Sequence, residues 1–196
     1  MMNKNHNSSY PLLLASASPR RLDLLKQIHI TPEHVIAADV DEASLKGEKP
    51  RACAVRLACA KAQAVHQNGG FTLAADTIVA CGVRMLPKTE DAAAARACLE
   101  LLSGRRHRIY GGIAVVRPDG RCVSRCVETV VQFKRLTSAE IEMYLETQEW
   151  NGVAGGYAIQ GYASAFIKSI RGSYSNVVGL SLYDTMSLLR GNGFWI

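Results

Sequence analysis

The first hydrophobic run of the chain leads directly into a polar and basic loop. Residues 12–15 read Leu-Leu-Leu-Ala, which is typical of a short buried strand. Pro19 follows where the first turn of a helix tolerates proline, and Ser18 is a candidate N-cap. Apolar residues then recur at positions 22, 24, 25 and 28, as on one face of an amphipathic helix. The pattern predicts a strand, a loop and a helix in that order.

Strand-like and helix-like runs continue to alternate up to about residue 104. The third apolar strand is expected to end on Asp76 and Thr77, before a turn at Gly82. Pro50 marks the start of a long alanine-rich helix. The expected elements are a strand near 34–38, a helix from 50 to before 69, a strand over 71–75, and a helix from 90 or 91 to 103.

The second half of the chain predicts a hairpin, further helices and a glycine-rich segment. Residues 118–120 (Pro-Asp-Gly) give a turn signal between apolar runs over 108–117 and 121–134. Thr137 and Glu140 have capping-box spacing ahead of a helix that runs through residue 145. A strand over 165–170 and a final helix over 182–190 complete the expected elements. We predict a mixed α/β fold with one domain over 10–196, preceded by a flexible polar N-terminus at 1–9.

The composition is that of an ordinary folded domain. Hydrophobic residues make up 48% of the 196 residues and charged residues 20%, which argues against disorder over most of the length. No apolar run approaches the length that crosses a bilayer, and the start lacks the pattern of a secretory signal. We therefore expect a cytoplasmic protein with no membrane partner.

The net charge of +6 favours an anionic ligand but does not by itself choose among nucleic acid, a membrane surface and a phosphorylated small molecule. The densest basic segment, 105–108, is short, and no long basic run is interleaved with aromatic residues. Nucleic acid is therefore not expected as a partner. The six cysteines form no CxxC pair, so we predict reduced thiols and neither a metal cluster nor a disulfide framework.

Two adjacent arginines, Arg20 and Arg21, lie at the predicted start of the first helix. Guanidinium groups pair bidentately with phosphate oxygens, and the free backbone N–H groups of a helix start attract anions. Together with Ser16, they form a candidate phosphate-binding loop. The same residues are also typical of a capped helix with solvated arginines, and the loop alone does not decide between these interpretations.

Separated acidic and basic residues could complete such a site. Asp76 follows an apolar strand, at the end where open α/β sheets place ligand-binding side chains. Glu42 closes the acidic stretch 39–42, and carboxylates from two segments can hold Mg²⁺. Lys61 and Lys88 are candidate phosphate ligands, although surface lysines and a solvated acidic loop are the alternative interpretation. Together the set offers cations, carboxylates and a base, which cleavage within a triphosphate requires.

The order of these motifs resembles the Maf family of nucleotide pyrophosphatases. The similarity spans almost all of 12–190, and several ordered motifs are far more specific than any one of them. The segments that carry it are 15–21 (ASASPRR), 40–42 (VDE), 56–62 (RLACAKA), 75–77 (ADT), 102–104 (LSG) with His107, 154–161 (AGGYAIQG) and 172–180 (GSYSNVVGL).

The resemblance implies an α/β fold shared with the inosine triphosphate pyrophosphatases, with two lobes around a central cleft and often a homodimer. It implies hydrolysis of a nucleoside triphosphate to the monophosphate and pyrophosphate with Mg²⁺ or Mn²⁺. By residue, Asp76 would activate water, Glu42 would assist, and both would contact the metal. The residues implied for phosphate binding are Ser16, Arg20, Arg21, Lys61 and Lys88.

Three positions resemble the branch of the family that acts on dTTP and UTP. These are Arg20 after the proline, Thr77 after the aspartate and Gln160 before the glycine, where the branch acting on 7-methyl-GTP typically carries Trp, Gln and Glu. The resemblance implies that these residues help to select the base. A side-chain amide suits this role because it both donates to and accepts from the edge of a pyrimidine.

Some positions depart from the family pattern. A proline usually follows the second lysine, whereas here Pro87 precedes Lys88, which could re-aim the lysine. Gly111, Val153 and Ser181 stand where threonine, lysine and proline are common. Two alternatives stay open. These departures motivate a nucleotide-binding regulator of cell division with weak catalysis, and the other alternative is a 7-methyl-GTP-type pyrophosphatase.

Overall fold

The structure is a computed structural model that describes residues 10–195. The predicted flexible segment 1–9 lies outside the described residues. A mixed sheet of seven strands forms the centre, in the order β2-β1-β3-β6-β7-β9, with β4 paired to β3. Its strands are β1 (Leu12–Ala15), β2 (His34–Ile36), β3 (Phe71–Cys81), β4 (Arg84–Leu86), β6 (Arg106–Val116), β7 (Cys122–Phe133) and β9 (Ile167–Arg171).

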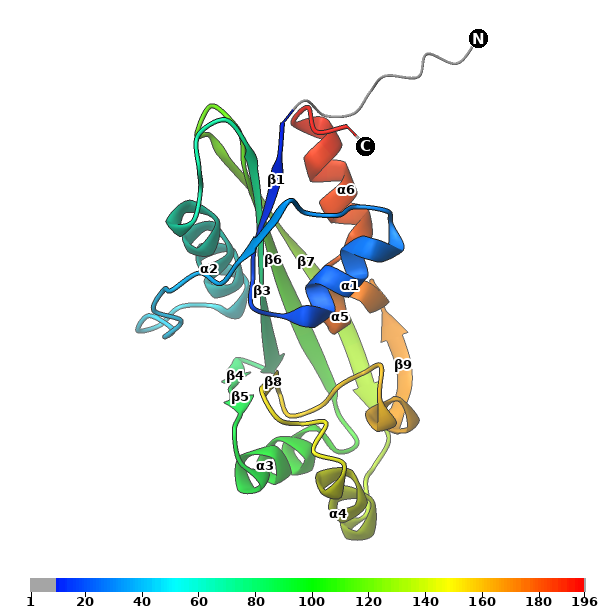
Figure 1. Cartoon of the computed structure of the whole chain (residues 1–196). Helices are drawn as coiled ribbons and strands as arrows, with labels where there is room; N and C mark the ends of the chain where they lie inside the picture. The colour runs from blue at the N-terminus through cyan, green and yellow to red at the C-terminus, as the bar shows by residue number, and fades with distance from the viewer. Residues whose placement is uncertain (1–9, 196) are drawn as a thin grey trace.

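Helices cover both faces of this sheet (Figure 1). On one face lies α2 (Pro50–Ala64), and on the other lie α1 (Pro19–Gln27), α5 (Tyr174–Val178) and α6 (Leu182–Gly191). A second group, at the far end of the sheet, holds α3 (Ala92–Leu102), α4 (Ser138–Glu146) and a two-stranded sheet of β5 (Lys88–Thr89) and β8 (Val153–Ala154). The predicted α/β class is confirmed.

Three buried hydrophobic clusters hold these layers together. Small residues dominate the contact under α2, where Ala58 and Ala62 pack with Ala74 and Ala114 of the sheet. Gly112 has the same role, because a Cβ there would lie 2.0 Å from the carbonyl oxygen of Ala54. The helix can therefore pack close to β3 and β6, and this close packing brings its side chains within reach of the sheet.

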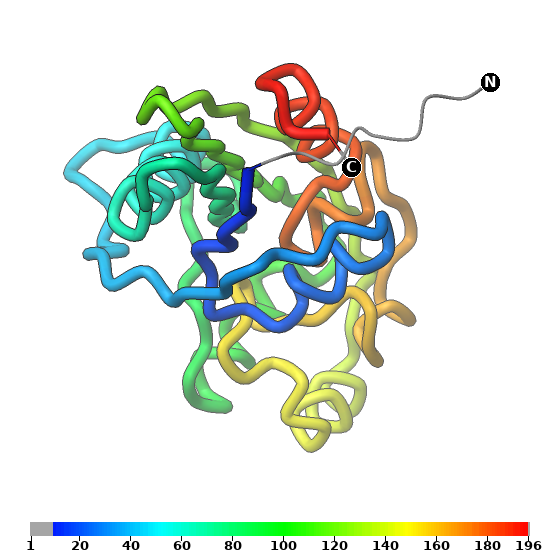
Figure 2. The backbone as a smooth tube through the Cα atoms, turned by 45° about the horizontal axis from the view of Figure 1, so that its top comes forward, coloured from blue at the N-terminus to red at the C-terminus, as the bar shows by residue number. Residues whose placement is uncertain are grey.

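Long side chains fill the other two clusters. Leu24 and Leu25 of α1 pack with Leu189 of α6 against the opposite face of the sheet. Leu99 of α3 and Tyr144 of α4 belong to the cluster at the far end. The two ends of the described chain lie close together in both views (Figures 1 and 2), and the rings of Phe71 and Phe194 meet edge to face there at 5.5 Å.

The predicted end of the third strand at Asp76 and Thr77 is wrong. Strand β3 continues from Phe71 to Cys81 and pairs with β6 along this length, with Asp76 opposite Gly112. The parallel partner β1 does end here, at Ala15 opposite Ala74. A charged residue is tolerated inside the strand because a lysine of α2 pairs with it, as described below. Asp76 thus lies just past the end of β1 but in the middle of its own strand.

Most other predicted elements are confirmed, including the hairpin around residues 118–120 and the capping box of Thr137 and Glu140. The expected strand over 165–170 is partly wrong: a 3₁₀ helix occupies Tyr162–Phe166, and β9 begins at Ile167. Helix α5 and the small sheet of β5 and β8 were not expected. They are too short to show a hydrophobic period.

The cysteines and the helices match two expectations from the sequence, namely reduced thiols and no apolar segment long enough to span a membrane. All six cysteines are free thiols, either buried or half-buried. Between residues 10 and 195, no helix combines the length and the hydropathy needed to cross a membrane.

Candidate functional site

A pocket of about 320 Å³ opens where β1 ends beside the centre of β3. The loop after β1 forms one wall, and segments 152–154 and 157–160 approach from the far end of the molecule. The end of α5 closes a third side. All nine residues predicted for the site line this pocket: Ser16, Arg20, Arg21, Glu42, Lys61, Asp76, Thr77, Lys88 and Gln160.

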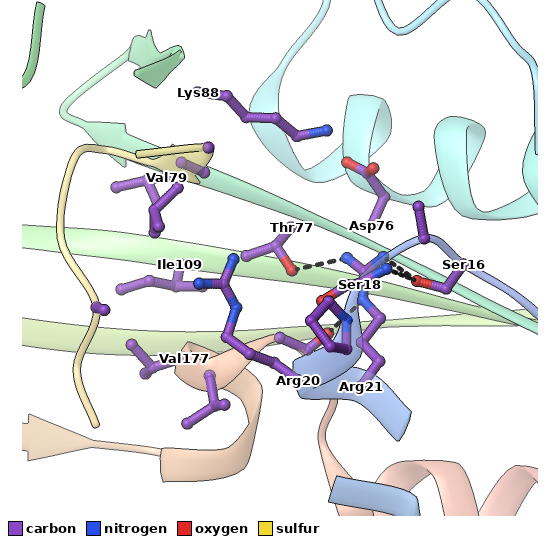
Figure 3. Close-up of a pocket in the computed structure, with 18 of the residues that line it drawn as sticks. Ser16, Ser18, Arg20, Arg21, Asp76, Thr77, Val79, Lys88, Ile109 and Val177 are labelled. Atoms are coloured by element: carbon purple, nitrogen blue, oxygen red, sulfur yellow. Dashed lines mark hydrogen bonds between the residues drawn. The ribbon is translucent and has the colours of Figure 1, made fainter. Parts of the chain in front are cut away.

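Arg21 ties the basic loop to the two neighbouring elements. Its guanidinium group donates to Ser16 Oγ at 3.1 Å, to Thr77 Oγ1 at 3.3 Å and to the carbonyl oxygen of Gly179 at 3.0 Å. Figure 3 shows the side chain between Ser16 and Thr77. Burial lowers the pKa of Arg21, while Asp76 and Glu42 act in the opposite direction. The arginine therefore fixes the shape of the loop and also places a half-buried positive charge on the pocket wall.

Arg20 and Ser18 differ from Arg21 in what their side chains contact. The side chain of Arg20 extends into the pocket, toward Thr77 and Ile109 (Figure 3). Ser18 occupies the predicted N-cap of α1, but its side chain makes no capping bond. Its backbone N–H instead donates to Ser16 Oγ at 3.2 Å. The turn of the loop is thus held by Ser16.

A chain of alternating charges crosses the pocket opposite the basic loop. Lys61 Nζ lies 2.6 Å from Asp76 Oδ1 and 2.6 Å from Glu42 Oε1. Lys88 Nζ lies 2.5 Å from Glu42 Oε2. The Lys61 and Asp76 side chains are buried, with 8% and 5% exposed, whereas Glu42 and Lys88 are 41% and 52% exposed. The structure thus brings these four predicted residues together at one place in the pocket.

The acidic loop contributes one carboxylate to the pocket. Glu42 lines the pocket, while the side chain of Asp41 accepts from the backbone of Ala43 and is exposed. Partial burial would raise the pKa of Glu42, but hydrogen bonds from Lys61 and Lys88 outweigh burial and hold the pKa at about 2. Glu42 is therefore an anion at neutral pH.

The other end of the pocket is apolar. Val79 of β3, Ile109 of β6, and Val177 and Val178 of α5 line it, beside the segment 157–160 (Figure 3). Gly155 allows this segment to approach, because its φ is +73° and a Cβ would meet Val79 at 2.9 Å. A flat apolar group of the size of a pyrimidine suits such a wall.

The positions that depart from the family pattern have clear places in the structure. Lys88 reaches the pocket despite the preceding proline, because β5 pairs with β8 and the carbonyl oxygen of Pro87 accepts from Gly155. Val153 lines the pocket without adding charge. At Gly111, a Cβ would meet the amide oxygen of Asn176 at 1.9 Å, so glycine leaves room for that buried amide.

Sequence reasoning missed the residues that hold the segment 157–160 and α5 in place. The hydroxyl of Tyr144 accepts from the backbone N–H of Ala158 at 3.1 Å. The Asn176 amide donates to the carbonyl oxygens of Ile109 and Val127 and to Thr129 Oγ1. The amide of Asn176, next to two valines, was the one available signal, since buried polar side chains require partners.

His107 gives the stability of the protein a pH dependence. Its Nε2 lies 2.7 Å from the Tyr157 hydroxyl, and burial lowers its pKa to about 4. The unfolded chain therefore takes up this proton first, so the free energy of unfolding should fall as the pH drops from about 6.5 toward 4, by on the order of 1 kcal/mol per pH unit. Urea unfolding at pH 7 and pH 5 measures this. The slope over that range should shrink in His107→Gln, and an unchanged slope would assign it to other groups.

The fold and the pocket define an α/β protein whose pocket has a charged end and an apolar end. Four cationic side chains face two carboxylates at one end, and apolar residues line the other. The chain belongs to the Maf family: the family described as Maf-like protein matches residues 11–192. The resemblance drawn from the motifs is thereby confirmed.

Relatives match the chain over nearly its full length. A dTTP/UTP pyrophosphatase of Paramagnetospirillum magneticum is 62% identical over 185 residues, which cover 93% of this chain and 97% of that protein. A protein of the same name from Rhodospirillum rubrum is 56% identical over 189 residues, covering 95% and 90%. Among solved structures, a HAM1 protein from Coxiella burnetii aligns over 94% of both chains with 18% identity and a TM-score of 0.47.

Proposed function

We propose that the protein hydrolyses dTTP and UTP to the nucleoside monophosphate and pyrophosphate. The observation that carries the proposal is the single pocket in which Arg20, Arg21, Lys61 and Lys88 meet Asp76 and Glu42. The relatives named dTTP/UTP pyrophosphatase support the same reaction. Cleavage within a triphosphate needs charge neutralisation on the phosphates together with a base for water, and this pocket supplies both.

Asp76 is the residue that we assign to the activation of water. Its carboxylate is buried, and Lys61 holds one of its oxygens at 2.6 Å, which fixes its direction. A base held in this way accepts a proton without the reorganisation that a mobile side chain would need. Arg20 and Lys88, which line the pocket, bind the phosphates. Arg21 and Ser16 keep the loop in the shape that receives them.

A divalent cation, Mg²⁺ or Mn²⁺, belongs to this proposal, and the donors present fit it. Glu42 and Asp76 both direct a carboxylate oxygen at one point, which the ammonium group of Lys61 occupies. Hard oxygen donors at such a point suit Mg²⁺, which commonly takes one or two carboxylates and completes its shell with phosphate oxygens and water. Across residues 10–195, no set of three or more His, Cys, Asp or Glu side chains forms a metal site. When bound, the metal would neutralise charge on the phosphates.

Selection of the base is assigned to Arg20, Thr77 and Gln160, all of which line the pocket. The test is a panel of nucleoside triphosphates with Mg²⁺, measured as initial rates of pyrophosphate release. We expect kcat/KM for UTP and dTTP to exceed that for the purine triphosphates. Gln160→Ala should lower this preference by about three- to ten-fold, as expected for the loss of one or two hydrogen bonds to the ring. Faster hydrolysis of a purine triphosphate by the unmodified protein would contradict the proposal.

The proposal includes a cytoplasmic location and a nucleotide ligand, with no nucleic acid or membrane as a partner. The pocket, about 320 Å³ in volume, is of the size that takes one small molecule. Dimer formation, implied by the family resemblance, remains part of the same proposal. Sedimentation of the purified protein with and without a nucleotide measures it directly, and a monomer over the micromolar range would remove it.

A further inference from the structure

The ammonium group of Lys61 lies at the one point of the pocket where a bound cation would meet two carboxylates. Its Nζ is 2.6 Å from Glu42 Oε1 and 2.6 Å from Asp76 Oδ1. The side chain of Lys61 is 8% exposed, so water screens its attraction to the two carboxylates only weakly. Lysine reaches the position because α2 packs against the sheet through small residues, two of which flank Lys61 at Ala58 and Ala62.

The charge of the pocket adds a second barrier to a metal ion. Its lining holds four cationic side chains and two carboxylates, which leaves a net charge of two positive before any ligand is present. A divalent cation would be repelled by this field and would also have to displace a buried ammonium group from its partners. A triphosphate reverses the balance, because it brings about four negative charges near neutral pH.

We propose that Lys61 occupies the cation position between Glu42 and Asp76, so that the free protein has no site for a divalent metal and the metal enters only together with the phosphates of the nucleotide. The inference rests on the proposed function for the identity of the ligand. The metal position exists only after the triphosphate has neutralised the surrounding cations. Lys61 then has a second role besides holding Asp76, which is to occupy the position between the two carboxylates and keep the empty pocket closed to cations.

Lys61→Met and Lys88→Met form a matched pair for the test. Each removes one lysine that contacts Glu42, and each changes the net charge by the same amount. The ammonium group of Lys88 contacts Glu42, and the side chain is 52% exposed. The ammonium group of Lys61 lies between the two carboxylates. Binding of Mn²⁺ alone is measured by electron paramagnetic resonance of the free ion, with no nucleotide present. We expect Lys61→Met to bind Mn²⁺ at least about ten-fold more tightly than either Lys88→Met or the unmodified protein.

Thermal unfolding gives an independent readout. Lys61→Met leaves two carboxylates close together, so its Tm should fall by about 6 °C or more, and millimolar Mn²⁺ should restore part of that loss. The unmodified protein should show no shift with Mn²⁺ alone. It should show a larger shift with Mn²⁺ plus a UTP analogue whose α–β bridge is a methylene group than with that analogue alone.

The outcomes separate the inference from the proposed function. Tight binding of Mn²⁺ to the unmodified protein without a nucleotide would overturn the inference, and so would equal affinities of the two lysine variants. The measurements on the unmodified protein keep the test decisive if Lys61→Met does not fold. None of these measurements requires turnover, so a failure to hydrolyse UTP would count against the proposed function alone.

Discussion

Asp76→Asn should lower kcat for UTP by about 10²–10⁴-fold, the range expected when a positioned general base is lost. The amide has the shape of the carboxylate and can still accept from Lys61 Nζ, which lies 2.6 Å from Asp76 Oδ1. It cannot take a proton from water at neutral pH. The fold should therefore persist while the chemical step fails. Initial rates of pyrophosphate release, together with the far-ultraviolet circular dichroism spectrum and the Tm, measure the two effects separately.

Asp41→Asn is the matched control for this variant. Asp41 belongs to the same acidic loop as Glu42, but it is exposed, and its carboxylate accepts from the backbone N–H of Ala43. Loss of the Asp41 carboxylate should leave kcat within two-fold of the unmodified protein, since Asp41 does not line the pocket. UTP should still bind Asp76→Asn, because the four cationic side chains remain. Turnover by Asp76→Asn at the rate of the unmodified protein would remove Asp76 from the role assigned to it.

Arg21→Lys is the second variant with a large expected effect. A lysine retains the positive charge but not the planar fork that reaches Ser16, Thr77 and the carbonyl oxygen of Gly179 at once. The loss should cost about 1–3 kcal/mol in the free energy of unfolding. It should also lower kcat/KM for UTP by about 10- to 100-fold, because the loop no longer presents Arg20 and the helix start in one fixed arrangement.

Arg190→Lys is the control for the arginine change itself. Arg190 is exposed in the last turn of α6, away from the residues that line the pocket. Urea unfolding and steady-state kinetics on both variants give the two free-energy differences on one scale. Should Arg21→Lys match Arg190→Lys in both measurements, the arginine would be an ordinary surface charge and the loop would not depend on it.

The fold could be predicted from the sequence where the residues of an element, or its close neighbours in the chain, determine that element. The run 12–15 with Pro19, the turn at 118–120 and the capping box at Thr137 all act within a few positions. Asp76 shows the limit of such patterns. A charged residue after five apolar ones looks like the end of a strand, and only its pairing with Lys61, fifteen positions earlier, lets β3 continue.

The candidate site was likewise predictable in part: its charged residues could be predicted from the sequence and its apolar end could not. Its charged residues were predictable because phosphate chemistry requires cations and carboxylates, and their order resembles that of one family. Its apolar end was not, since Val79, Ile109 and Val177 come from three separate elements. The hydroxyl of Tyr144, which holds the backbone of Ala158, was also invisible, because tyrosine at that place in a helix reads as an ordinary core residue.

The most direct test of the central claim is the identity of the products of UTP hydrolysis, followed by ³¹P nuclear magnetic resonance with Mg²⁺ present. The account predicts that the three resonances of UTP give way to those of UMP and pyrophosphate, and that Asp76→Asn produces neither within the same time. Accumulation of UDP and orthophosphate would contradict the claim, because it would place the cleaved bond at the terminal phosphate.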